Sequence, residues 1–492
     1  MQTSGDNGYD REHPRGENVT YNRVHSGVVE DLQKIVGSKH VVADPEKMQD
    51  YSHDEFSLSD IARLPEVVVK PKDAQEVSRI LGLANRELVP VTPRGGATGL
   101  CGGCVPAFGG IVVSLERMNR IIEVDRRNQM AVVEAGVTLA DFYTCVEEEG
   151  LFFPPHPGEE SAMIGGVIAT NAGGARAVKY GVVRNYVRGM DVVLPTGPII
   201  RLGGKLMKSS TGYSLLNLMV GSEGTLGIIT RAMIQLMPAP AATRSLIMPY
   251  ETLEEAIDAV PALLEKNILP LAVEFIPTDV IRITEEFLRK RWPCTLGTTH
   301  LLVILDAGSE EELDRLSEDV ADVCCAHGAM DVFVADSPSK QSQVLEIRSK
   351  IYEAIKAHTL EIMDIVVPRA EIASHVRKVR ELSEEFGLWL PTFGHAADGN
   401  VHTHIMKARY EGGRLIPLPE EEWKPKFGKV REALYRDCRE RRGMISGEHG
   451  IGLVKKPYLA YVLDEAQIAL IKGIKSVFDP NHILNPGKII EP

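Results

Sequence analysis

The chain has 492 residues, of which 44% are hydrophobic and 25% are charged. This length exceeds what one hydrophobic core usually organises, so it predicts two or three domains, and the composition excludes a disordered or fibrous chain. The 55 Lys and Arg residues against 68 Asp and Glu residues give a formal net charge of -13, so we expect no nucleic acid partner and no anionic lipid surface.

The chain carries no sequence signal for a membrane or for secretion. No run approaches the roughly 20 apolar residues that span a bilayer, and the N-terminus lacks the charged start and apolar core of a signal peptide. We expect no transmembrane segment and a cytoplasmic location, either free or peripheral to a membrane complex. The seven cysteines are an odd number, which argues against a disulfide framework. Cys101 and Cys104 form a single CxxC in a glycine-rich loop, which favours small loop residues over redox chemistry.

The composition and hydrophobic periodicity of the sequence change along the chain. Residues 1–24 are polar and aperiodic, which indicates a flexible leader. Residues 25–240 alternate short β-branched runs with glycine clusters, a pattern of buried strands between turns. After the proline-containing stretch 237–241, longer amphipathic patterns between apolar runs predict an α+β domain over 241–440. Residues 441–492 regain glycine-rich loops.

Three glycine clusters, at residues 93–103, 164–174 and 220–229, interrupt the first domain. The first follows a strand-like run, and its glycines let backbone N–H groups approach an anion closely, as a diphosphate requires. Neither GxGxxG nor GxxxxGK[ST] occurs in the chain, which disfavours a Rossmann or P-loop fold. One such cluster could serve turns and tight packing alone, but three in one domain favour close approach of the backbone to a ligand.

Residues 393–404 contain the sharpest chemical signal, three histidines around an Asp398-Gly399 dipeptide. Asp-Gly is a preferred two-residue hairpin turn. With this dipeptide at the tip, His395 would lie directly opposite His402, and Asn400 would share their face. Two opposed imidazoles can close on one metal ion, with stacked or hydrogen-bonded histidines as the alternative.

A second motif, at residues 446–452, places Glu448 and His449 between glycines. No helical or strand face would turn both side chains to one side, so we expect them to have different roles. Two histidines and Glu448 would make a three-ligand site with open positions, which is typical of a catalytic metal. His449 would then be free to act as a base.

The order of these motifs, with Pro154-Pro155 between the first two glycine clusters, resembles the FAD-linked D-2-hydroxy acid dehydrogenases. These form the D-lactate dehydrogenase, glycolate oxidase flavin-subunit and D-2-hydroxyglutarate dehydrogenase branch of the vanillyl-alcohol-oxidase superfamily. The resemblance covers nearly everything after the leader. It implies an α+β fold: a two-subdomain FAD-binding domain at 25–240, a substrate cap at 241–440, and a C-terminal segment at 441–492 that packs back on the FAD-binding domain.

The resemblance implies that the FAD diphosphate lies over the first glycine loop and that the flavin ring lies near the second cluster. We expect non-covalent FAD, because the first loop has no histidine for a covalent link. His156 would lie near the flavin edge, either as an ordinary loop residue or as a contact. The residues expected to contact FAD are Arg94, Gly95, Gly96, Ala97, Thr98, Gly99, Gly102, Gly103, Pro155, Ser161, Gly165, Gly166, Asn171, Gly173, Gly174, Tyr180, Gly181, Glu223, Gly227, Ile228 and Asn485.

The resemblance assigns His395, His402 and Glu448 to a divalent metal ion and His449 to proton abstraction. Zn, Fe(II) and Mn suit imidazole and carboxylate ligands about equally. The expected reaction moves a hydride from C2 of a small 2-hydroxy acid to flavin while the hydroxyl loses its proton. A metal on the substrate oxygens would lower the hydroxyl pKa, and a histidine accepts a proton near neutrality.

The resemblance also places Arg348 on the substrate carboxylate, where a planar guanidinium matches two oxygens. From the residues alone Arg348 equally fits a solvated helix position. Asn400 and His404 complete the expected substrate contacts, with packing or an extra metal contact as alternatives for His404. In the hydroxyglutarate branch we expect a basic residue at position 362 and an asparagine at 404, where this chain has Ile362 and His404. These departures favour D-lactate or another short monocarboxylate over 2-hydroxyglutarate.

Reduced flavin needs an electron acceptor, and the chain has neither a nicotinamide fingerprint nor cysteines spaced for an iron-sulfur cluster. We therefore expect an external acceptor, such as an electron-transferring flavoprotein or an iron-sulfur subunit. The rival hypotheses are a flavin enzyme acting on a sugar, lactone or alcohol, and a flavoprotein subunit that only relays electrons. A metal-binding module without flavin would leave the three glycine clusters unexplained.

Overall fold

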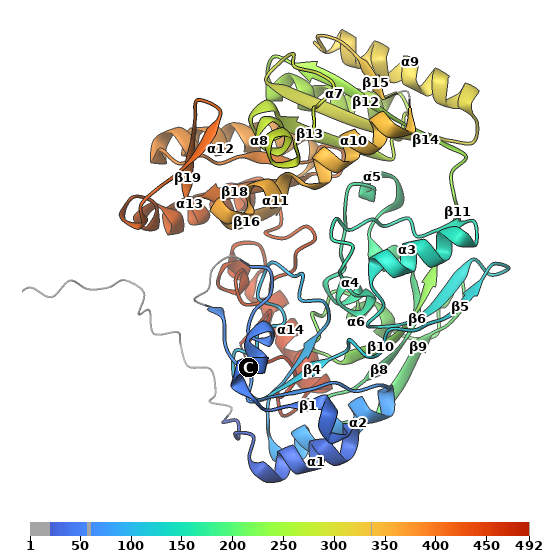
Figure 1. Cartoon of the computed structure of the whole chain (residues 1–492), viewed down its shortest axis with the longest axis vertical. Helices are drawn as coiled ribbons and strands as arrows, with labels where there is room; N and C mark the ends of the chain where they lie inside the picture. The colour runs from blue at the N-terminus through green and yellow to red at the C-terminus, as the bar shows by residue number, and fades with distance from the viewer. Residues whose placement is uncertain (1–19, 57–60, 336, 492) are drawn as a thin grey trace, which may run out of the picture.

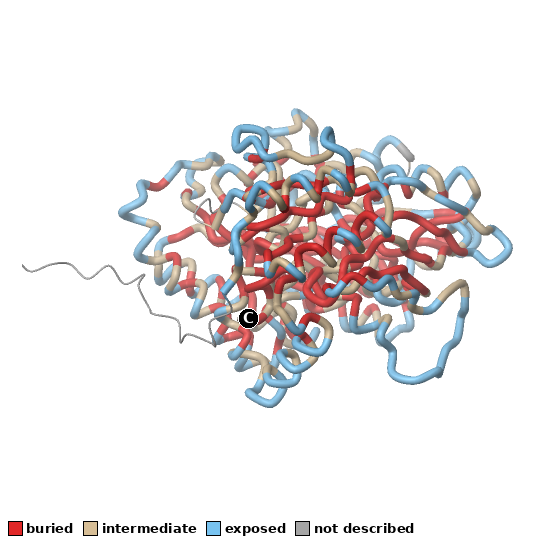
Figure 2. The backbone as a smooth tube through the Cα atoms, turned by 90° about the horizontal axis from the view of Figure 1, so that it is seen from below, coloured by how far each residue is buried: buried red, intermediate tan, exposed pale blue. Residues whose placement is uncertain are grey.

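In the computed structural model of the chain, residues 20–56, 61–335 and 337–491 are described (Figure 1). The first 19 residues of the predicted leader therefore lie outside the described residues. The described residues form five sheets, of which three are large, and helices cover them, so the predicted α+β fold class is confirmed. In Figure 2 the buried residues run through the interior of the molecule, and most exposed residues lie at its periphery.

The first large sheet has four strands in the order β1-β2-β4-β3, and β2, β3 and β4 run parallel. Helices α1 and α2 pack on it through one apolar cluster that includes Leu32, Ile80 and Val113. Helix α2 begins where the Asp73 carboxylate accepts the backbone N–H of Glu76, which satisfies a free donor of the first turn. The elements are α1 (Ser26–Val36), β1 (Val41–Val42), β2 (Val67–Val69), α2 (Ala74–Glu87), β3 (Val91–Arg94) and β4 (Ile111–Ser114).

The second sheet has five antiparallel strands in the order β5-β6-β10-β8-β9. Helices α3 and α4 bury Phe142 and Ile168 in its core. A two-stranded β11-β7 pair lies where the chain leaves for the next domain. The elements are β5 (Ile121–Asp125), β6 (Met130–Glu134), α3 (Leu139–Glu148), β7 (Leu151–Phe152), α4 (Ile164–Thr170), α5 (Ala177–Tyr180), β8 (Val187–Val193), β9 (Ile199–Gly203), α6 (Leu215–Met219), β10 (Ile228–Gln235) and β11 (Met237–Pro238).

The third sheet has seven antiparallel strands in the order β15-β12-β14-β13-β17-β18-β16. Helices α7, α9, α12 and α13 cover one face, and α8, α10 and α11 cover the other. The strands are β12 (Ala242–Tyr250), β13 (Ala272–Pro277), β14 (Thr299–Ala307), β15 (Phe333–Ala335), β16 (Thr359–Val366), β17 (Thr392–His395) and β18 (Asn400–Met406), with a separate pair β19 (Ala408–Glu411) and β20 (Arg414–Pro417). The helices are α7 (Leu253–Glu265), α8 (Thr278–Leu288), α9 (Glu310–Ala326), α10 (Pro338–Ser349), α11 (Ile351–Ile355), α12 (Ile372–Phe386) and α13 (Glu420–Glu440).

The last part of the chain returns to the first domain, where helix α14 (Glu465–Phe478) packs Ile474 and Phe478 against the core of the five-stranded sheet (Figure 1). Leu484 forms a parallel bridge with Val91 of β3. The buried Lys475 ammonium donates to the backbone carbonyls of Thr225 and Leu484. Before this return, Met444 bridges to Val366 of β16, so residues 441–455 connect the seven-stranded sheet with the glycine-rich part of the molecule.

Candidate active site

A single cavity of about 1180 Å³ joins the glycine-rich loops to one face of the seven-stranded sheet. Of the residues expected to contact FAD, those that line it are Arg94, Gly95, Gly96, Ala97, Thr98, Gly99, Gly103, Gly165, Gly166, Gly174, Glu223, Gly227 and Ile228. Those that lie outside its lining are Gly102, Pro155, Ser161, Asn171, Gly173, Tyr180, Gly181 and Asn485. Arg348, His395, His402, His404, Glu448 and His449 also line this cavity, whereas Asn400 does not.

The first glycine loop has the properties of an anion cradle. The backbone N–H groups of residues 96–99 donate to no acceptor within the described part of the chain. A Cβ atom on Gly96 would lie 2.9 Å from the Ser161 carbonyl oxygen, so the loop approaches its neighbour as only glycine allows. A Cβ on Gly166 would meet no protein atom within 4 Å and would instead extend into the cavity. Free amides beside open space fit the diphosphate of FAD.

Three of the expected cofactor residues have polar side-chain groups that form hydrogen bonds within the protein. The Arg94 guanidinium donates to the backbone carbonyls of Asp50 and His53, so its charge anchors a neighbouring segment. The Glu223 carboxylate accepts the N–H groups of Ile451 and Gly452, each at 2.7 Å. The Asn485 amide donates to the carbonyls of Gly103 and Glu223. These contacts fasten the C-terminal segment to the glycine loops and so shape the cavity wall.

The structure brings His395, His402 and Glu448 together, with one ligand atom of each within 4.8 Å of the others. Glu448 Oε1 lies 3.3 Å from His402 Nε2 and 3.9 Å from His395 Nε2. On its other side, His395 Nδ1 hydrogen-bonds Glu274 Oε1 at 2.5 Å. A carboxylate on the second imidazole nitrogen is the usual support of a histidine that binds a metal. The donor set therefore fits a divalent cation with open coordination positions.

The predicted hairpin register is wrong, although the predicted face is right. His395 pairs with Asn400 and Phe393 pairs with His402, so residues 396–399 form a four-residue turn. Of the dipeptide, only Gly399 has a positive φ, of 95°, and the type I′ geometry that needs two is absent. The shift is two residues, which preserves the alternation, so both histidines still face the side covered by α10.

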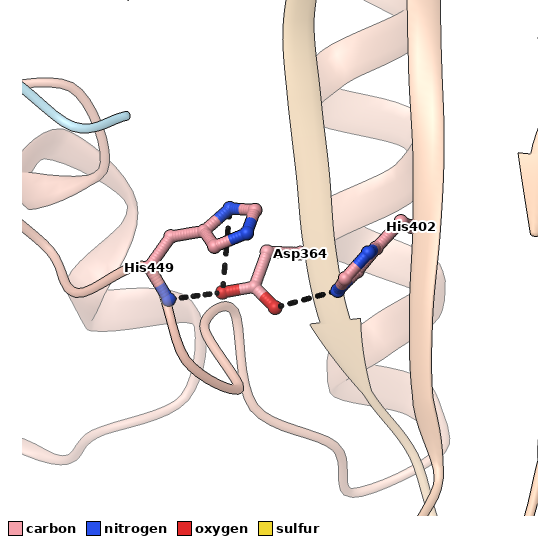
Figure 3. Close-up of side chains that lie close together, drawn as sticks. All are labelled: Asp364, His402 and His449. Atoms are coloured by element: carbon pink, nitrogen blue, oxygen red, sulfur yellow. Dashed lines mark hydrogen bonds and ion pairs between the residues drawn. The ribbon is translucent and has the colours of Figure 1, made fainter. Parts of the chain in front are cut away.

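A second group, Asp364, His402 and His449, also lies close enough together to hold a metal (Figure 3). The Asp364 carboxylate, however, already has its acceptors filled. Its Oδ2 accepts the Ser446 hydroxyl and the backbone N–H groups of residues 447, 448 and 449, at 2.8 to 3.1 Å. Lys455 Nζ lies 3.2 Å from the same oxygen and would repel a cation. Asp364 thus organises the loop that carries Glu448 and His449, a role that no local sequence pattern indicates.

Burial and neighbouring charge set the protonation of the site. Burial lowers the pKa of His449 to about 4, and the nearby Asp364 carboxylate opposes this shift without cancelling it. Burial also opposes charge on His395 and His402, but the adjacent carboxylates outweigh it and raise both pKa values. In turn, hydrogen bonds from these imidazoles hold the pKa of Glu448 below its usual range despite burial. The cluster attracts positive charge, and His449 stays neutral and able to accept a proton.

The expected substrate residues separate into two groups. Arg348 extends from α10 over the Phe393 ring, 5.5 Å from its centroid, and pairs with Glu274. His404 stacks on the same ring, with centroids 4.8 Å apart, and burial holds its pKa well below the usual value. Both residues line the cavity. The Asn400 amide, in contrast, donates to Asp364 Oδ1 at 2.8 Å and makes its contacts inside the protein.

Comparison with known proteins agrees with this architecture. Residues 239–489 match the family model for the C-terminal domain of FAD linked oxidases, and residues 65–203 match an FAD binding domain model. No helix among the described residues is long and apolar enough to cross a membrane.

Curated relatives match over almost the whole chain. D-lactate dehydrogenase of Anaerostipes hadrus is 43% identical over 95% of this chain and 98% of its own. D-lactate dehydrogenase of Archaeoglobus fulgidus is 44% identical over 86% and 91%, and glycolate oxidase subunit GlcD of Bacillus subtilis is 36% identical over 91% and 95%. A solved 4-ethylphenol oxidase from Gulosibacter chungangensis shares the fold, with a TM-score of 0.76 at 20% identity over 94% of this chain and 96% of its own.

Proposed function

This chain belongs to the FAD-linked oxidase family and is an FAD-linked dehydrogenase, and on that premise we propose that it oxidises D-lactate to pyruvate with the help of a divalent metal. One observation carries the proposal. The glycine loop that fits the FAD diphosphate and the His395, His402 and Glu448 cluster lie on the wall of one cavity. A substrate between them would contact both the cofactor and the metal, as hydride transfer requires.

We assign a separate role in the reaction to each group of the site. FAD, which we expect to be held non-covalently, would supply the acceptor for the C2 hydride. Arg348 binds the substrate carboxylate and orients C2. His449 takes the hydroxyl proton, for which its neutral imidazole is suited. His395, His402 and Glu448 would hold Zn, Fe(II) or Mn, which would lower the pKa of the substrate hydroxyl.

Two cavity residues support a short substrate. Ile362 and His404 pair across β16 and β18, and both line the cavity. Ile362 is apolar, and the depressed pKa keeps His404 neutral. A second carboxylate placed beside this pair would lose its hydration without gaining a cation from either residue. This favours D-lactate first, then glycolate, with D-2-hydroxyglutarate disfavoured among the related acids.

The parts of the chain have different roles in this proposal. We infer that residues 25–240 hold FAD, that residues 241–440 form the substrate cap, and that residues 441–492 join the two. The electrons leave to an external acceptor, such as an electron-transferring flavoprotein or an iron-sulfur subunit, because the sequence has no nicotinamide fingerprint and no cluster-type cysteine spacing. We infer that the enzyme works in the cytoplasm, free or on the periphery of a membrane complex.

Anaerobic bleaching of the flavin absorbance tests this proposal. FAD-loaded protein is mixed with D-lactate, L-lactate, glycolate and D-2-hydroxyglutarate, before and after chelation and after return of the metal. We expect rapid bleaching by D-lactate that chelation removes and metal restores. Bleaching by a sugar or an alcohol, but by no hydroxy acid, would overturn the proposal in favour of an oxidase on the same scaffold. Metal-replete protein that no donor bleaches would indicate an electron-relay subunit.

A further inference from the structure

Glu274, in the middle of β13, connects two parts of the site that no local sequence pattern connects. Its side chain is almost fully buried. Its Oε1 hydrogen-bonds His395 Nδ1 at 2.5 Å, and its Oε2 accepts Arg348 Nε at 2.8 Å and the Arg348 Nη2 group as well. Strand pairing places Glu274 directly opposite His395, while Arg348 approaches from α10 above the same face. One carboxylate therefore holds a metal-ligand candidate and the candidate carboxylate-binding arginine together.

The contact with His395 decides which nitrogen can bind a metal. An ionised carboxylate only accepts hydrogen bonds, so the Nδ1 atom of a neutral His395 must carry the proton. The lone pair is then on Nε2, which faces Glu448 Oε1 at 3.9 Å. Glu274 thus selects the tautomer in which His395 can act as a ligand.

The contact with Arg348 decides which edge of the guanidinium is available. The Nε–H group and one N–H group of Nη2 donate to Glu274 Oε2. The remaining edge of the guanidinium, which includes Nη1, is left for a second acceptor. The guanidinium also lies over the Phe393 ring, which restricts its rotation. Arg348 lines the cavity beside the metal cluster. Glu274 therefore sets the position of the arginine relative to His395.

We propose that Glu274 is a positioning residue that keeps His395 competent to bind metal while it holds Arg348 in place for the substrate carboxylate. The inference rests on the proposed function for the substrate half, but its metal half stands on the contacts of Glu274 alone. His395 and Arg348 each donate to a different oxygen of Glu274. If one of these oxygens is lost, the two donors compete for the acceptor that remains.

The Glu274→Gln variant makes this competition measurable. Glutamine has the same shape but offers one acceptor oxygen and one NH₂ donor. Arginine cannot accept a hydrogen bond, so the amide oxygen must face Arg348 and the NH₂ group must face His395. His395 can satisfy the NH₂ donor only by moving its own proton to Nε2, and it then loses the lone pair that binds metal. Removing Arg348 allows the amide to turn around and return its oxygen to His395.

The experiment is a double-mutant cycle on FAD-loaded protein, with Mn²⁺ or Zn²⁺ affinity measured against a competing chelator in the absence of substrate. We expect Glu274→Gln to weaken metal binding by about 10- to 100-fold. Arg348→Met alone should change it by less than about threefold, and the double variant should return to the level of Arg348→Met within the same factor. If Glu274→Gln acted only by disrupting the structure, the double variant would bind metal more weakly than either single variant.

Glu361→Gln is the matched control, because Glu361 is a buried carboxylate in strand β16 of the same sheet and pairs with Arg431 of α13. It should leave metal affinity unchanged. Unchanged metal affinity in Glu274→Gln, or no recovery in the double variant, would overturn the inference. Wild-type protein that binds metal normally but is not bleached by D-lactate would instead contradict the proposed function, so the two failures are distinguishable.

Discussion

Lys455 Nζ lies 3.2 Å from Asp364 Oδ2, and both side chains are almost completely buried. The ammonium balances the charge of a carboxylate whose Oδ2 atom also accepts three consecutive backbone N–H groups at residues 447–449. The interactions with His449, Lys455 and His402 hold the pKa of Asp364 well below its usual value, although burial alone would raise it. A buried ion pair thus fixes the loop that presents the metal ligand and the base.

Replacing Asp364 with asparagine should damage both stability and turnover. The amide would either turn its NH₂ group toward the N–H donors of residues 447–449, or turn its oxygen toward them and leave the Lys455 ammonium without a negative partner. Breaking a buried ion pair in this way costs about 3–5 kcal/mol. We expect the free energy of unfolding in urea to fall by that amount and the rate of flavin bleaching by D-lactate to fall at least 100-fold. Ser446→Ala, which removes one donor to the same oxygen, should cost only about 1 kcal/mol. Equal losses in the two variants would contradict this role of Asp364.

Glu448→Gln should separate metal binding from FAD binding. The amide keeps the shape of Glu448 but removes the negative charge between two imidazoles, so the bound metal should fall well below one ion per chain. FAD content should stay at the wild-type level, since the glycine loops are intact. Metal analysis and the flavin spectrum check both values. Added metal should restore bleaching to chelated wild-type protein but not to Glu448→Gln, and recovery of the variant would refute the ligand assignment.

Gly166→Ala should weaken FAD binding without harming the fold. Gly166 lies in helix α4, where alanine is favoured by roughly 0.5–1 kcal/mol, and the added methyl group meets no protein atom within 4 Å. The methyl group would instead extend into the space expected for the flavin. We expect the FAD dissociation constant to rise at least about tenfold while the FAD-free protein unfolds at the same or a higher temperature. Gly82→Ala in helix α2, which also has open space, should raise stability and leave FAD affinity unchanged.

His156 should make the fold sensitive to acid. Burial lowers its pKa to about 4, and the nearby Arg176 adds to the shift. An unfolded histidine has a pKa of about 6.5, so between these values the unfolded state binds a proton that the folded state refuses. Stability contributed by this group is therefore complete above about pH 6.5 and is lost as the pH falls toward 4.

His156→Gln tests this sensitivity, because glutamine does not titrate. Between about pH 7 and about pH 4.5, wild-type protein should lose roughly 2 kcal/mol more of its unfolding free energy than the variant, as follows from the two pKa values. Urea denaturation of the FAD-loaded proteins at both pH values measures the difference. Parallel losses in the two proteins would show that His156 does not set the acid limit.

The hairpin at residues 396–399 marks the limit of prediction from a local motif. Asp398-Gly399 predicts a two-residue turn, but the Ala396 N–H group donates to Val273 of the adjacent strand β13 and the Asp398 carboxylate accepts the Asn400 N–H group. These contacts favour a four-residue turn, so His395 pairs with Asn400 instead of the predicted His402. The alternation of side chains along a strand does not depend on the turn, so the shared face was predicted correctly.

The sequence by itself determined the glycine clusters, the spacing of His395 and His402, and the Glu448-His449 pair, because each is a local pattern whose chemistry depends on residue type. It also determined the α+β class through alternating apolar runs. Only the tertiary structure decided that Glu274 and Asp364 support these residues. Strands β13 and β16 flank the β17-β18 hairpin in the sheet but lie far from it along the chain. A buried carboxylate on such a strand finds its partners through sheet order and register, which depend on the packing of the whole domain.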